Sequence, residues 1–245
     1  MSENALAVLS ELNLPSTELA SDEVYTGLAK STEFLGRLQL YSKGSAVNRK
    51  LIGPGEFGIP EGDEIIGLGE SVDLIPLARR PKALDMSDKE AIIADYDANS
   101  DVFKDIQVRS EGPDSGCMWG ISFLVIERTT GRLVEFFCGT KSTRQEAGKM
   151  FNFLTLTQAQ IDKAAEQGKD VSKLQPHGPL PMTLKSKLVE TGKFSWHVPV
   201  VLPCSTPFNR LPPVDVMNKE VAKFLTVKNG GVEKAEAAPK SRRAR

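Results

Sequence analysis

The pattern of hydrophobic and polar positions in the middle of the chain predicts two β-hairpins with one helix between them. Each expected strand is a short β-branched and aromatic run, and each pair is joined by a turn containing glycine, which permits the positive φ of a hairpin turn. Ser142 and Gln145 have the spacing of a capping box, so a helix is expected to begin there. The expected strands are 120–128 and 132–138, joined at Gly131, and 184–190 and 194–201, joined by Thr191 and Gly192.

Two earlier segments extend this pattern. Residues 71–77 are expected to form a strand, and residues 34–41 alternate as a half-buried strand does, with Leu38 and Leu40 on one face. The order strand, hairpin, helix, hairpin is typical of a small Greek-key barrel of the oligonucleotide-binding (OB) type. The expected fold class is therefore mainly β, an OB-like Greek-key barrel with a helix between two hairpins and helical appendages at both ends.

The 245 residues are expected to form one domain with appendages. The amphipathic spacing of Val214, Met217, Val221 and Leu225 predicts a helix that could join copies of the chain into a homo-oligomer. The expected parts are a helical arm over 1–32, a β-barrel domain over 33–210 with an acidic, mostly loop-like insertion at 85–105, the amphipathic helix within 211–228, and a disordered basic tail over 229–245.

Charge is distributed unevenly along the chain. The segments 1–114, 115–210 and 211–245 carry net charges of −10, +5 and +4, although the whole chain carries only −1. This asymmetry indicates that the barrel half faces an anion. Random unevenness of a solvated surface is the alternative explanation.

The remaining composition restricts the function class. Cys117, Cys138 and Cys204 are odd in number and far apart, which is typical of buried thiols in the cytoplasm. No apolar run is long enough for a membrane span, so no membrane partner is expected. Neither His177 nor His197 has metal-ligand spacing to a cysteine, and no catalytic constellation stands out. No metal, cofactor or enzymatic activity is therefore expected.

Basic and aromatic residues favour binding of a single-stranded nucleic acid, which needs cations along the phosphates and rings on which bases stack. The second hairpin is expected to have a cationic face and, opposite it, an apolar face with Phe194 and Trp196. The alternative is that most rings are core and most lysines only solubilise. The candidate nucleic-acid-binding residues are Arg79, Arg80, Lys82, Trp119, Arg128, Arg132, Lys141, Arg144, Lys185, Lys187 and Lys193.

Several short strings over about residues 34–204 resemble a group of poorly characterised bacteriophage proteins. They include Arg80-Pro81-Lys82-Ala83-Leu84, Ser115-Gly116-Cys117-Met118 and Trp196-His197. The strand order is similar to that of phage single-stranded DNA-binding proteins, which implies a role in DNA replication or recombination in the host cytoplasm. Such binders commonly end in an acidic tail, whereas this chain ends in a basic one.

The leading hypothesis is a non-enzymatic, sequence-nonspecific single-stranded DNA-binding protein of phage-type DNA replication or recombination. A virion or assembly protein that uses the helix 214–225 to contact other copies is the first alternative. A metal-dependent nuclease is the second, since carboxylates such as Glu61, Asp63 and Glu64 could hold a divalent ion.

Overall fold

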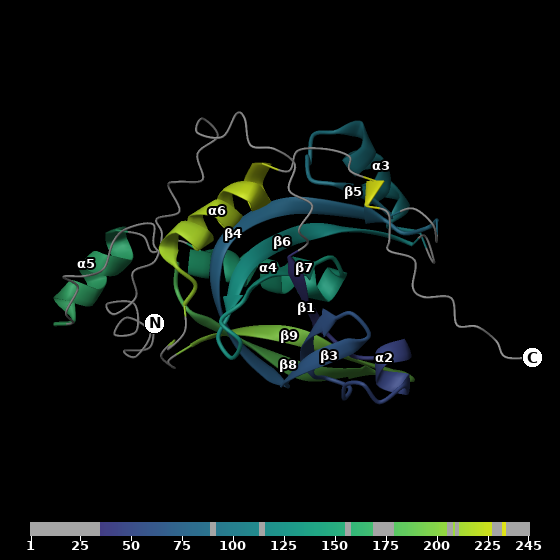
Figure 1. The fold of residues 1–245 in the computed structure, drawn as a ribbon, viewed down its shortest axis with the longest axis horizontal. Coiled ribbons are helices and arrows are strands. Elements are labelled where there is room, and N and C mark those ends of the chain that lie inside the picture. The colour runs from purple at the N-terminus through teal and green to yellow at the C-terminus, as the bar shows by residue number, and fades with distance from the viewer. Residues whose placement is uncertain are drawn as a thin grey trace, which may run out of the picture.

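The structure is a computed structural model, and it describes residues 35–88, 92–112, 116–154, 158–168, 179–204, 208, 211–226 and 232–233. Strands dominate these residues (Figure 1), so the predicted mainly β fold class is confirmed. The helical arm expected over 1–32 lies outside the described residues. The basic tail expected over 229–245 also lies outside them, except for a two-residue strand.

Ten strands of the described residues form one mixed sheet. Its order is β10-β5-β4-β6-β7-β1-β2-β3, and the hairpin β8–β9 joins the first half of β4. Every pair is antiparallel except β1 with β7. The strands are β1 (Gly36–Leu40), β2 (Phe57–Glu61), β3 (Glu64–Gly69), β4 (Ser71–Asp85), β5 (Ile92–Asp95), β6 (Cys117–Glu127), β7 (Leu133–Cys138), β8 (Met182–Thr191), β9 (Phe194–Pro203) and β10 (Val232–Glu233).

Helices cover both faces of this sheet. Ala147, Met150 and Leu154 of α4 pack into a core with sheet residues such as Phe123 and Phe136. On the opposite face α6 packs along β4 (Figure 1). We call these two faces the α4 side and the α6 side. The helices are α2 (Ser45–Asn48), α3 (Asp101–Arg109), α4 (Lys141–Leu154), α5 (Gln158–Glu166) and α6 (Val214–Thr226).

The predicted order of strand, hairpin, helix and hairpin is present as β4, β6–β7, α4 and β8–β9. Two details differ from prediction. The helix begins at Lys141, because Thr140 and Thr143 cap each other: each backbone N–H donates to the other's hydroxyl. The second turn is formed by Gly192 and Lys193, with Gly192 at a φ of 57°.

Strand β4 is twice as long as the predicted strand 71–77, and it contains two prolines. Residues 71–74 pair with β8 and residues 83–85 pair with β5, while β6 lies along the other edge. Pro76 and Pro81 therefore fall where one edge of β4 has no partner strand, and their missing N–H groups break no ladder there. The basic string Arg79-Arg80-Pro81-Lys82 is consequently part of the sheet and not a loop that follows it.

The sheet does not close, which corrects the expectation of a closed barrel. Within the described residues β9 pairs only with β8, and its outer edge is met by side chains instead of a strand. His197 N–H donates to Ser42 Oγ (2.9 Å), and Val201 N–H donates to Glu146 Oε2 (3.0 Å). Pro199 offers no donor between them. Side chains thus satisfy the edge that a closing strand would occupy.

The acidic insertion is more ordered than predicted. Residues 92–95 form β5, where a mostly loop-like insertion was expected, and the helix α3 follows. Ser100 caps α3 by accepting the Phe103 N–H, and Asp95 accepts from Ser100 Oγ and from the Asp97 N–H. Carboxylates in this segment therefore stabilise a turn and a helix start.

Helix α6 has the predicted amphipathic pattern, but its apolar face is used within the chain. Met217, Val221 and Phe224 are buried against Ile75 and Leu124 of the sheet. This face is therefore not exposed to contact another copy. The expectation of a homo-oligomer formed through the helix 214–225 loses its structural basis.

Candidate nucleic-acid interface

The hairpin β8–β9 places lysines and aromatic rings on one face, contrary to the prediction of separate cationic and apolar faces. In its register Lys185 pairs with Val200, Lys187 with Val198, and Val189 with Trp196. Directly paired residues of an antiparallel ladder share a face. A two-residue turn pairs odd positions of β8 with even positions of β9, so the lysines and the rings must point the same way.

This face points away from the core. On the opposite face Leu184 and Val201 belong to the core under α4. Phe194 is 72% exposed, and the lysines are exposed as well. Leu188, on the same face as Leu184, lies beyond the edge of this core and is 48% exposed. We call the outward set the hairpin face: Lys185, Lys187, Val189, Phe194, Trp196, Val198 and Val200.

The charge of the hairpin face is positive. The acidic neighbour of the hairpin face on β4 is Asp73, which pairs with Thr183 in the sheet. The Thr183 hydroxyl donates a hydrogen bond to the Asp73 carboxylate (2.6 Å). Arg128 Nε lies 3.1 Å from the same carboxylate. Lys185 and Lys187 have no ion-pair partner among the described residues. Lys193 lies at the exposed turn of the same hairpin. The cations here therefore outnumber the carboxylate.

Arg80 and Lys82 lie on the α6 side of the sheet in a buried polar network around Glu135. Lys82 Nζ is 2.9 Å and Arg80 Nη2 is 3.3 Å from the carboxylate, which also accepts from the Ser122 hydroxyl. Arg80 further donates to the Phe224 carbonyl and stacks on the Tyr96 and Phe224 rings. Arg80 thereby ties the sheet to α6.

The network fixes the ionisation of Glu135. Burial alone would raise the pKa of this carboxyl, but the charges of Lys82 and Arg80 and the Ser122 hydroxyl lower it to about 2. Burial lowers the pKa of the Lys82 ammonium, and Glu135 opposes that change. Lys82 is only 1% exposed and is held by Glu135, so it does not lie on an outer surface along which an extended strand could run.

The other candidate residues lie elsewhere. Arg144 stacks on the Trp119 ring and donates to the carbonyls of Trp119 and Gly139, so this ring is partly covered. Arg79 lies over the exposed Phe151 ring of α4. Arg132 forms an ion pair with Glu61. Lys141 is exposed at the start of α4.

The structure thus gathers Arg128, Lys185, Lys187 and Lys193 around one hairpin and leaves the remaining candidates apart from it. A single trough lined by all eleven residues is not formed. Sequence reasoning omitted Phe194 and Trp196 from the site because it assigned them to the core. The register of a two-residue turn would have placed them beside the lysines.

The described residues contain no group of three or more His, Cys, Asp or Glu side chains that could hold a metal ion. Cys117, Cys138 and Cys204 are buried, and burial raises the pKa of the Cys138 thiol to about 12. None of the helices described is both long enough and apolar enough to cross a membrane.

Comparisons with protein-family models, curated proteins and solved structures each find no match.

Proposed function

We propose that this protein binds single-stranded DNA without sequence preference and that the hairpin face is its main contact surface. The observation that carries the proposal is that the exposed Lys185 and Lys187 share one outward face with the exposed Phe194 and the half-buried Trp196. Lysines at alternate strand positions contact successive phosphates, and ring faces stack on unpaired bases of any sequence. A duplex hides its base faces, so this surface favours a single strand.

The strand order supports the proposal in part. We propose that the sheet is an OB-like barrel opened between β7 and β9. In this reading β4 is the long strand that pairs with both β6 and β8, and α4 connects the two hairpins as the OB helix does. The inserted strand β1 runs parallel to β7 and contacts β9. A role in phage-type DNA replication or recombination follows from the resemblance in sequence.

The structural-protein alternative is less well supported. Its distinguishing feature was an amphipathic helix exposed to other copies, and that helix covers the chain's own sheet. The more exposed apolar residues of α6 are Val214, which is 38% exposed, and Val216, which is 40% exposed. Both lie in the first turn of the helix. Two such residues do not form an extended contact surface.

Fluorescence anisotropy of a labelled oligo-dT tests the proposal. The variant Lys185→Ala/Lys187→Ala is expected to bind more weakly than the wild type and to show a shallower salt dependence. The slope of log K against log salt should fall by about 1.4, since each lost phosphate contact on a single strand contributes about 0.7.

The matched control is Lys104→Ala/Lys163→Ala, which removes the same charge from exposed positions on α3 and α5. It should retain the wild-type slope. Equal affinities and slopes for the two double variants would show that the hairpin face contributes no specific contacts.

A further inference from the structure

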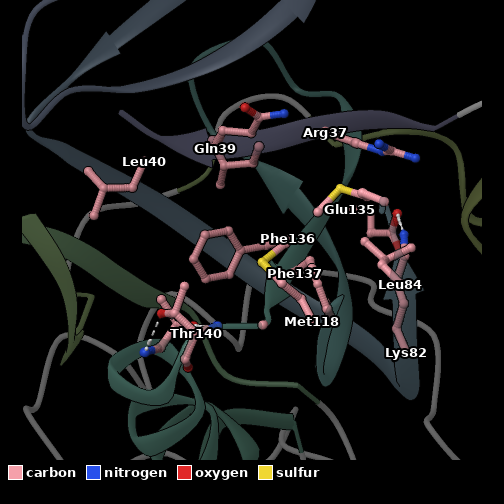
Figure 2. Close-up of a pocket in the computed structure, with 14 residues that line it drawn as sticks. Arg37, Gln39, Leu40, Lys82, Leu84, Met118, Glu135, Phe136, Phe137 and Thr140 are labelled. Carbon is pink, nitrogen blue, oxygen red and sulfur yellow. Dashed lines mark hydrogen bonds and ion pairs between the residues drawn. The ribbon is translucent and has the colours of Figure 1, made fainter. Parts of the chain in front are cut away.

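A pocket of about 330 Å³ opens on the α6 side of the sheet, between β1, β4, β6 and β7. It is separate from the hairpin face, because no residue of β8 or β9 lines it. The volume is at the lower end of the range for small-molecule pockets. Figure 2 shows its two parts: Arg37, Lys82 and Glu135 lie together at one end, and Phe137 and Met118 lie between them and Thr140.

The charged end of the pocket holds more cationic than anionic side chains. Among the described residues that line the pocket, Arg37 and Lys82 are cations and Glu135 is the one carboxylate. Arg37 and Arg80 are each close enough to Lys82 to act on it electrostatically. The Lys82 ammonium has three donors, and among the described residues Glu135 is its one hydrogen-bond acceptor. A buried ammonium with unused donors favours a ligand that brings an anionic oxygen.

The middle of the pocket is apolar and suits a flat ring. Leu84 and Met118 are cross-strand partners on β4 and β6, and the adjacent Phe137 comes from β7. Aromatic and methionine side chains pack well against planar heterocycles. Gln39 and Thr140 add amide and hydroxyl groups at the rim, which can hydrogen-bond to polar ring edges.

We propose that this pocket binds one nucleotide, with its base against Phe137 and Met118 and its phosphate toward Arg37 and Lys82. The proposal deepens the proposed function, since the nucleotide would belong to the bound strand. A free mononucleotide has the same base and phosphate chemistry, so the bound nucleotide has two possible sources: the bound strand and free mononucleotide. The pocket would then hold a single unstacked nucleotide at a distance from the contacts of the hairpin face.

Methyl NMR of the full chain with ¹³C-methyl methionine tests the proposal without altering the pocket. Met86 and Met118 line it, whereas Met150, Met182 and Met217 are buried in the cores. Addition of thymidine monophosphate or oligo-dT should shift the Met86 and Met118 signals and leave the three core signals in place. Thymidine without phosphate should bind more weakly. The variant Met118→Leu assigns its signal.

A charge variant with a matched control adds an affinity measurement. Arg37→Gln should weaken thymidine monophosphate about tenfold, as expected for loss of one charge-assisted contact. Arg49→Gln, at an exposed position that does not line the pocket, should change the affinity less than twofold. The core methionine signals report whether either variant is folded.

The outcomes separate this proposal from the proposed function. An oligo-dT that binds the protein but leaves Met118 unshifted refutes the nucleotide pocket and retains the DNA-binding function. Thymidine monophosphate that shifts Met118, with no affinity for oligo-dT, supports a free-nucleotide site and refutes the DNA-binding function. Equal effects of Arg37→Gln and Arg49→Gln refute the assignment of the phosphate.

Discussion

Replacement of Glu135 by leucine is expected to destabilise the fold by about 3–5 kcal/mol. The carboxylate is the hydrogen-bonding partner of the buried Lys82, and it also pairs with Arg80 and accepts the Ser122 hydroxyl. The variant leaves the Lys82 ammonium buried without an anion. Urea unfolding at neutral pH, followed by circular dichroism, measures the loss.

A second substitution tests whether the pairing is the cause. Lys82→Met keeps the aliphatic stem of the side chain, so the double variant Glu135→Leu/Lys82→Met should be more stable than Glu135→Leu alone. The single variant Lys82→Met is measured as well. If the losses of stability in Glu135→Leu and in Lys82→Met simply add in the double variant, the destabilisation arises from packing and not from the buried charge.

Acid is expected to remove the stabilisation that Glu135 provides. Its pKa is lowered from 4.5 to about 2 in the folded chain, so the unfolded state binds its proton first as the pH falls. The contribution is present above about pH 4.5 and is lost as the pH falls through about 2. Its size is about 3 kcal/mol. The measurement is the free energy of unfolding of the wild type and of Glu135→Gln between pH 7 and pH 2.

The stability gap between these two proteins should narrow toward pH 2. Asp85 titrates in the same range, because hydrogen bonds from Ser87 and the pairing with Arg109 lower its pKa to about 2. That carboxyl is present in both proteins and cancels in the comparison. A difference in unfolding free energy that stays constant over the whole pH range would mean that this network does not lower the pKa of Glu135.

The sequence predicted the strands, hairpins and helices whose hydrophobic period is strong. Strand β1, with Leu38 buried and Gln39 exposed, follows its alternation, and α6 follows its helical spacing. Gly131 and Gly192 both have the positive φ that the turns required. These features depend on local residue order, which is what periodicity reports.

Features that depend on distant residues were not predictable in this way. The string Arg79-Arg80-Pro81-Lys82 reads as a solvated basic loop, yet Lys82 is buried because Glu135, more than fifty positions later, lies beside it. The open edge of β9 likewise depends on Ser42 and Glu146, which come from other parts of the chain. Single-sequence patterns carry no information about such pairings.

The candidate site was predicted in part. The lysines of the second hairpin were identified from composition and parity, and they are exposed on one face. The rings beside them were assigned to the core, because aromatic residues are buried more often than not. Phe194 is exposed because the hairpin tip extends beyond the core that α4 covers.

The central claim is that unpaired bases stack on the hairpin face, and Trp196 fluorescence tests it most directly. The chain has two tryptophans, so the variant Trp119→Phe leaves Trp196 as the reporter. Oligo-dT at low salt should quench its emission to saturation, and added salt should restore it. Oligo-dT that fails to bind, or that binds while the emission of Trp196 stays unchanged, would contradict the account.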